Sequence, residues 1–221
     1  MTFYNVGHSN ELEIIGYYPQ TQRTKRLGYH VDDYNSERNV TPDLFPEFAP
    51  NYGLDLNPKS IATDVIDRGT LEFGIVISEN LRKILHDYNL PPHKFYPIDV
   101  YNSNRNYYWF HYISNFRSFF DVKNSEVEIF DIFKQEIVDV VRFNSFEELN
   151  DFNRQLILQV GKTMRYRLIK LRPSFPKYDL FEIKGAQHFT VISDRLKNEL
   201  ERQSITGLEY MKYNMIEITP L

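Results

Sequence analysis

Three groups of residues in this sequence carry side chains that could do chemistry. The first is Gly161-Lys162-Thr163, which matches the end of a phosphate-binding P-loop. That loop needs another glycine five residues before Gly161, because its backbone amides must turn around the phosphate. Leu156 stands at that position, and the residues before it have a helical rather than a strand pattern. We therefore predict no nucleotide site here.

The other two groups contain histidine beside carboxylates or serine. His30, Asp32 and Asp33 could bind a divalent metal, but adjacent acids in a polar stretch are usually solvent-exposed. His188 lies near Ser193 in sequence, yet a catalytic triad is a spatial arrangement and is not set by sequence proximity. The six histidines show no paired metal-ligand spacing. We predict no catalytic residue, no metal and no cofactor, and hence no enzyme.

An internal repeat indicates how the chain is organised. The stretch from Val76 to Leu85 aligns without gaps to the stretch from Val191 to Leu200, with Val, Ile, Ser and two Leu identical. Each copy starts with a short strand-like run and continues with leucines at helical spacing, before a second extended run. The sequence therefore predicts two related strand-helix-strand units, at residues 71–100 and 186–215.

A serine separates strand from helix in both copies. The hydroxyl oxygen of Ser78 or Ser193 can accept a hydrogen bond from a free amide at the start of the helix. The acid that follows, Glu79 or Asp194, is favourable at the positive end of the helix dipole. We interpret both serines as structural N-caps rather than nucleophiles.

The remaining elements complete an α+β pattern. A capping-box sequence at Ser145 begins a third helix, whose apolar stripe continues to Val160. Strand-like runs follow at residues 163–171 and precede it at 107–112. Closely spaced prolines make residues 1–70 an irregular N-terminal segment. We predict an α+β fold with a mixed sheet, in which residues 1–221 form a single domain.

Composition limits the cellular setting and the partners. The chain has no cysteine, which favours a reducing, cytoplasmic compartment. Its first residues lack the basic and apolar regions of a signal peptide, and its apolar runs are far shorter than the ~20 residues of a membrane-spanning helix. Acids outnumber bases by 30 to 26, so we expect no nucleic acid and no membrane among its partners.

Charge is unevenly distributed along the chain. Residues 121–151 contain nine acids and three bases, whereas residues 152–172 contain six bases and no acid. One interpretation is that the two segments neutralise each other in the fold. The other is an acidic docking face for a basic partner. The candidate partner-binding residues on that face are Glu126, Glu128, Asp131, Glu147, Glu148 and Asp151.

Three blocks, in chain order, resemble a known family. They are Val76 to Pro97, Asp121 to Ser125, and Phe181 to Tyr210. Together they resemble immunity protein family eleven of bacterial polymorphic toxin systems, formerly a domain of unknown function, over roughly the last two-thirds of the chain. The resemblance implies a cytoplasmic protein that binds a cognate toxin domain and blocks its active site. It implies no catalytic residues.

Two other functions stay open from the sequence. One is a small hydrolase or transferase whose active site is assembled from distant residues, which would show as a pocket with perturbed carboxylates or histidines. The other is a scaffold protein that forms homo-oligomers through an aromatic surface, which the size of the purified protein would reveal. The sequence leaves the oligomeric state and the identity of the toxin open.

Overall fold

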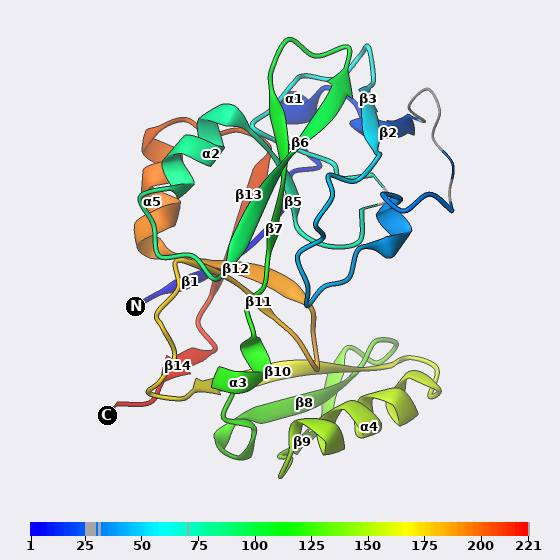
Figure 1. Ribbon diagram of the computed structural model, residues 1–221. Helices are drawn as coiled ribbons and strands as arrows, with labels where there is room; N and C mark the ends of the chain where they lie inside the picture. Colours follow the sequence, from blue (N-terminus) through cyan, green and yellow to red (C-terminus); the bar gives the residue numbers. More distant parts are fainter. Residues whose placement is uncertain (25–29, 31, 70, 221) are drawn as a thin grey trace.

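The computed structural model describes residues 1–24, 30, 32–69 and 71–220. The described strands form three sheets, and parallel and antiparallel pairs occur together with helices. Figure 1 shows two of the sheets in an upper body and the third in a lobe below it. The predicted α+β fold with a mixed sheet is confirmed.

The first predicted unit is a four-stranded antiparallel arrangement with one helix. Its elements are β4 (Val65–Ile66), β5 (Ile75–Ser78), α2 (Glu79–Leu85), β6 (His93–Tyr101) and β7 (Tyr107–Tyr112). The strands lie in the order β4-β5-β7-β6, and each pairs antiparallel with its neighbour. Helix α2 follows β5 directly, as the repeat predicts.

The second unit has the same architecture. It consists of β11 (Leu180–Ile183), β12 (Phe189–Ser193), α5 (Asp194–Arg202), β13 (Leu208–Tyr213) and, from the start of the chain, β1 (Phe3–His8). The strand order β11-β12-β1-β13 reproduces the order in the first unit, again with antiparallel neighbours. Strand β1 therefore occupies the position that β7 has in the first unit.

The two units also share their strand register. Val65 pairs with Ile77 in the first unit and Leu180 pairs with Ile192 in the second, so both residues of the pair are displaced by 115 positions. A constant displacement through two strands and a helix means that the two copies have the same local geometry. The prediction of two related units is confirmed, and each unit is larger than the sequence match indicates.

The N-terminal segment is more regular than its prolines predict. Besides β1 it contains α1 (Leu12–Ile15), β2 (Thr21–Thr24), the 3₁₀ turn η1 (Glu37–Asn39) and β3 (Gly53–Leu56). Strand β2 pairs with β3, and β3 pairs in parallel with β6. These two strands extend the sheet of the first unit to six strands.

The units pack face to face through a shared core. Ile77, Leu81 and Leu85 of the first unit belong to the same buried cluster as their counterparts Ile192, Leu196 and Leu200 of the second. Figure 1 shows α2 and α5 side by side at one edge of this core. Burying leucines at helical spacing from both helices supplies much of the favourable free energy, at about 25 cal/mol per Å² of apolar surface.

Most of the lower lobe is inserted in the sequence between the two units, and its last strand follows the second unit. Its sheet has the order β14-β10-β8-β9 and comprises β8 (Glu126–Asp131), β9 (Glu136–Val141), β10 (Lys162–Leu171) and β14 (Ile216–Ile218). The predicted third helix is α4 (Phe146–Ile157), which packs against this sheet.

The start of α4 has half of the predicted capping box. The Ser145 hydroxyl oxygen accepts a hydrogen bond from the Glu148 amide at 3.1 Å, as predicted, but the Glu148 carboxylate accepts one at 2.7 Å from the amide of Asn144, one residue before the cap. Two short elements, α3 (Phe116–Phe119) and the 3₁₀ turn η2 (Val122–Asn124), connect the upper body to the lobe.

The two cap serines belong to matching buried networks. Ser78 Oγ accepts from the Leu81 amide at 3.2 Å and donates to Asp64 Oδ1 at 2.7 Å. Ser193 Oγ accepts from the Leu196 amide at 3.1 Å and donates to Asp179 at 2.7 Å. The prediction that both serines are N-caps is confirmed.

Each buried aspartate also binds the opposite unit. Asp179 Oδ2 accepts a hydrogen bond at 2.9 Å from the amide of Asn89, which follows α2. Asp64 Oδ2 accepts one at 3.2 Å from the amide of Thr206, which follows α5. Each acid therefore joins the start of its own helix to the loop after the other helix.

We expect Ser78→Ala and Ser193→Ala each to lower the free energy of unfolding by about 1 to 2 kcal/mol, because each removes a cap and a hydrogen bond to a buried carboxylate. Urea unfolding of the purified variants measures this, with the exposed Ser118→Ala as the control. A change no larger than that of the control would contradict the structural role of the two serines.

Candidate binding surface

The six candidate acids lie in the lower lobe, but they do not form one face. Val127 and Ile129 of β8 share a core with Leu149 and Leu156 of α4, so α4 covers that face of the sheet. Successive strand residues point to opposite faces, so Glu126 and Glu128 lie on the side away from α4. The other acids lie on α4 or at the end of β8; they are Asp131, Glu147, Glu148 and Asp151.

The two acids on the open face of β8 are paired with arginines. Glu128 Oε1 accepts hydrogen bonds from Arg165 Nε at 2.9 Å and Nη2 at 2.6 Å, across the β8–β10 ladder. Glu126 pairs with Arg142 and lies 3.6 Å from Arg167 Nε. The hydrogen bond from Arg142 lowers the pKa of Glu126. Both carboxylates are committed to contacts within the lobe.

Asp131 stabilises the turn that joins β8 to β9. Its Oδ1 accepts hydrogen bonds from the backbone amides of Lys134 and Phe133, each at 3.0 Å. The bond from the Lys134 amide makes the largest contribution to lowering the pKa of Asp131. This acid has a local structural role as a turn cap.

The three acids of α4 have partners as well. Glu147 pairs with Arg117, Asp151 pairs with Arg154 one turn later, and the Glu148 carboxylate accepts a hydrogen bond from the Asn144 amide. Over residues 115–172 the sequence contains nine acids and ten bases. The folded lobe is therefore close to neutral, which favours mutual neutralisation over a free acidic face.

Exposed ion pairs of this kind contribute little to stability. Glu147 and Asp151 expose 58% and 61% of their side chains, and their arginine partners are similarly exposed. We expect Glu147→Lys and Asp151→Lys each to change the free energy of unfolding by no more than about 0.5 kcal/mol. Thermal unfolding of the variants measures this. A larger loss would show that these pairs help to hold the lobe together.

The candidate chemical groups are not assembled into a catalytic site. The His188 ring bonds to Glu182, whereas the Ser193 hydroxyl bonds to Asp179. His30 Nδ1 lies 3.8 Å from Asp32 Oδ2, with both side chains largely exposed. In the described part of the chain, no group of three histidine or acidic side chains has the arrangement needed to hold a metal ion.

A patch of exposed apolar side chains is the most unusual feature of the lower lobe. These side chains come from the turn after β8 and from the end of α4, where Leu158 and Val160 expose 82% and 87% of their surface. We call this set the tip surface. Its residues are Ile132, Phe133, Ile157, Leu158 and Val160. The exposed Ile137 and Val140 of β9 pair with Phe130 and Glu128, on the face of the sheet away from α4.

Local contacts hold the two parts of the tip surface together. The Ile132 amide donates to the Gly161 carbonyl at 2.7 Å, which joins the turn after β8 to the segment after α4. The Phe133 ring lies where a side chain on Gly161 would be, and Gly161 has a φ of +84°. A larger residue at Gly161 would be strained and would displace the ring.

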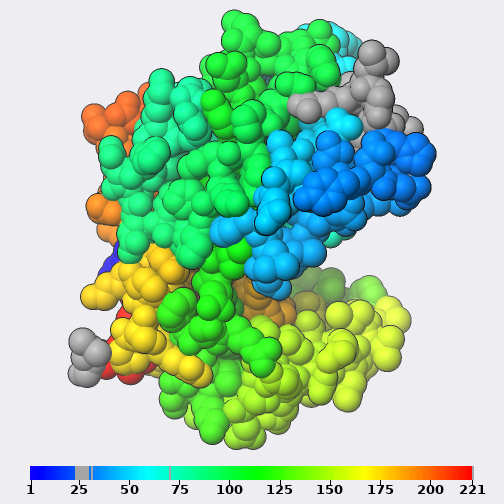
Figure 2. All heavy atoms as spheres, in the orientation of Figure 1, coloured from blue at the N-terminus to red at the C-terminus, as the bar shows by residue number. Residues whose placement is uncertain are grey.

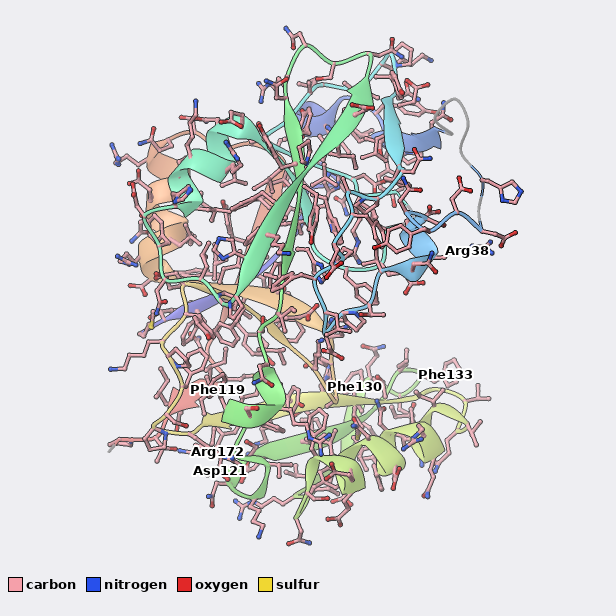
Figure 3. The ribbon with its side chains drawn as sticks, in the orientation of Figure 1. Arg38, Phe119, Asp121, Phe130, Phe133 and Arg172 are labelled. Carbon is pink, nitrogen blue, oxygen red and sulfur yellow. The ribbon has the colours of Figure 1, made fainter. Side chains whose placement is uncertain are left out.

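The tip surface borders a hollow. Figure 2 shows an indentation between the blue N-terminal segment of the upper body and the yellow-green lower lobe. In Figure 3, Phe130 and Phe133 lie on the side of the lobe that faces this hollow, and Arg38 lies across the hollow on the upper body. The guanidinium of Arg165 stacks over Phe130, 3.6 Å from its ring centroid.

Comparison with known proteins adds no identification. No protein-family model matches the chain, and no curated protein matches it. The family resemblance inferred from the sequence therefore stays a hypothesis. Within the residues that the structure describes, no helix has the length and apolar character needed to cross a bilayer.

Strand β9 lies at an edge of its sheet and pairs only with β8 among the described strands. Its ladder is interrupted by a register shift opposite Ile129 and Phe130. The Asp139 carboxylate also accepts a hydrogen bond from the Val140 amide at 2.8 Å. A bulge and a charge are devices that discourage a further strand from pairing at an edge. We therefore expect side chains, more than backbone groups, to contact a partner here.

Sequence reasoning missed the tip surface. The helical stripe predicts Ile157 and Val160 as core residues, yet Ile157 ends α4 and both side chains are exposed. Apolar spacing alone does not show where the covering sheet ends. A signal was present in the sequence, because apolar residues also occur in the turn at Ile132 and Phe133, where polar residues are usual.

Proposed function

We propose that this chain is a toxin-neutralising immunity protein, which binds a cognate toxin domain and blocks its active site in the cytoplasm. The observation that carries the proposal is the tip surface. Large apolar side chains gathered on one part of a soluble domain are a frequent mark of a protein-protein interface. The family resemblance of the sequence points to the same class of function.

The composition of the lobe suits such an interface. Interfaces have a desolvated apolar centre and a polar rim, and charged residues are depleted at the centre. The tip surface supplies the centre, and the paired acids Glu147 and Asp151 lie on the neighbouring helix α4 as candidate rim residues. Rim charges mainly affect the rate and selectivity of association. In this proposal Glu147 and Asp151 therefore assist binding without anchoring it, and the other four predicted acids have structural roles within the lobe.

The proposal can be tested in cells. On this proposal the neighbouring gene encodes the toxin, and the C-terminal domain of its product is expressed from an inducible promoter, alone or together with the chain. We expect growth arrest in the first case and normal growth in the second. Continued arrest, with the chain present as folded soluble protein, would rule out the immunity function. A chain that instead dimerises through the tip surface would elute at twice its 26.5 kDa mass.

A further inference from the structure

An apolar cavity lies between the two repeated units, away from the tip surface. Its volume is about 290 Å³. Apolar walls come from Val65 and Ile75 of the first unit and from Val6 and Leu208 of the second. Another cavity, beside the start of α2, is lined largely by polar and charged side chains, among them the ion pair of Arg105 with Asp64.

A difference between the two units creates this cavity. Val6 lies opposite Thr190 in the second unit, at the position where Phe110 lies opposite Ile75 in the first. Both residues face the shared core. In the first unit Phe110 stacks on Phe95, at 4.8 Å between ring centroids. The second unit has a valine where the first has a ring, so space stays open at this end of the core.

A neighbouring position shows the same difference. His8 pairs with Leu208 in the second unit, where the first unit has Tyr112 paired with His93. The His93 ring packs against Phe110, at 5.5 Å between ring centroids, so that side of the core is filled by aromatic rings. Leu208 carries no ring. Two rings of the first unit, Phe110 and His93, therefore correspond to the smaller Val6 and Leu208 in the second, and Phe189 adds a ring to the wall of the cavity.

The polar groups around the cavity are already engaged. Thr190 Oγ1 is 2.6 Å from the Tyr112 hydroxyl, and His8 Nε2 is 2.9 Å from Gln20 Oε1. Of the charged residues in its lining, Arg68 donates to the Gly74 carbonyl at 2.9 Å, and Asp67 Oδ1 accepts a hydrogen bond from the Gly69 amide at 3.1 Å. An ionised ligand would lose hydration without gaining a dedicated partner.

We propose that this cavity is a binding site for a small uncharged aromatic molecule. A cavity of roughly 150 Å³ lined by apolar side chains can hold benzene, so a volume about twice as large suits a bicyclic ring. Ligand sites are typically apolar pockets between structural units. The site is independent of the proposed toxin partner.

Indole is the probe, titrated into the full-length protein and followed by amide NMR. We expect saturable shifts confined to residues around the cavity, such as Val65, Ile75 and Leu208. Tryptamine and indole-3-propionate carry opposite charges on a similar ring, and we expect both to bind at least tenfold more weakly. The Val6→Phe variant places a ring where the first unit has one, and it should abolish the indole shifts.

Two further variants keep the test decisive. Val140→Phe adds a ring on the exposed strand β9 of the lower lobe and should leave indole binding unchanged. If Val6→Phe does not fold, Leu208→Phe fills the same cavity from the neighbouring strand and should also block indole. The inference is overturned if indole causes no saturable shifts, if the shifts map elsewhere, or if a folded cavity-filling variant binds indole as well as the original chain.

Discussion

Replacing Asp179 by alanine should lower the free energy of unfolding by about 3 to 5 kcal/mol, the largest loss expected for any single substitution considered for this chain. The Asp179 residue is only 1% exposed and accepts hydrogen bonds from Ser193, from Arg195 and from the Asn89 amide. Its removal leaves a buried hydroxyl, a guanidinium and an amide without their acceptor, and separates the two units at this contact.

Urea unfolding measures this loss, and Asp64→Ala is the matched variant in the other unit. We expect a large loss there too, because Asp64 contacts Ser78, Arg105 and Thr206 in a similar way. The exposed Asp87→Ala is the control and should change stability by less than about 0.5 kcal/mol. Losses at Asp179 and Asp64 no larger than the control would contradict their role in joining the units.

The same network should make stability depend on acid pH. Burial alone would raise the pKa of Asp179, but hydrogen bonds from Arg195, Ser193 and the Asn89 amide outweigh it and lower the pKa below its usual value. A carboxyl with a depressed folded-state pKa stabilises the fold above the unfolded pKa of about 3.9 and loses that contribution as the pH falls through the folded pKa. We therefore expect the difference in free energy of unfolding between Asp179→Ala and the original chain to become smaller as the pH falls below about 4.

The second large effect concerns the tip surface. We expect the double substitution Leu158→Asp and Val160→Asp to weaken binding of the toxin domain by about 2 to 4 kcal/mol, which is roughly 30-fold to 1000-fold. Both side chains are more than 80% exposed, so their replacement removes no core contact. Carboxylates in the centre of an apolar interface would be desolvated without partners.

Calorimetric titration measures that effect, with unfolding curves to show that the fold is intact. The control is Leu12→Asp, which places a carboxylate on an exposed leucine at the start of α1 in the upper body. We expect the control to bind as the original chain does. Equal affinities of the control and of the tip variant for the toxin domain would show that the interface does not include the tip surface.

The sequence predicts those parts of the fold that depend on local patterns. Strand, serine cap and leucine stripe follow one another within a few residues, so the repeat at Ser78 and Ser193 is visible without any long-range information. The strand that completes each unit is not visible in this way. In the first unit it is β7, which follows the repeat, and in the second it is β1, at the start of the chain. The pairing of β1 is set by contacts between distant segments.

The candidate site was harder to predict for a similar reason. Clustering of acids along the sequence favours an acidic face, but strand alternation and the pairing of β8 with β10 place Glu128 against Arg165. Arg154, Arg165 and Arg167 come from the basic segment that follows the acidic one, whereas Arg117 and Arg142 lie before and within the acidic segment. Exposure of Ile157 depends on where α4 and its sheet end, and the residues alone do not define that boundary.

The most direct test of the proposed immunity function is a titration of the toxin domain's own activity with the purified chain. The domain is the one encoded beside this chain, and its activity is measured as increasing chain is added. We expect activity to fall to zero at one equivalent of the chain, and to persist at that ratio when the Leu158→Asp, Val160→Asp variant is added instead. Full toxin activity in the presence of excess folded chain would contradict the account.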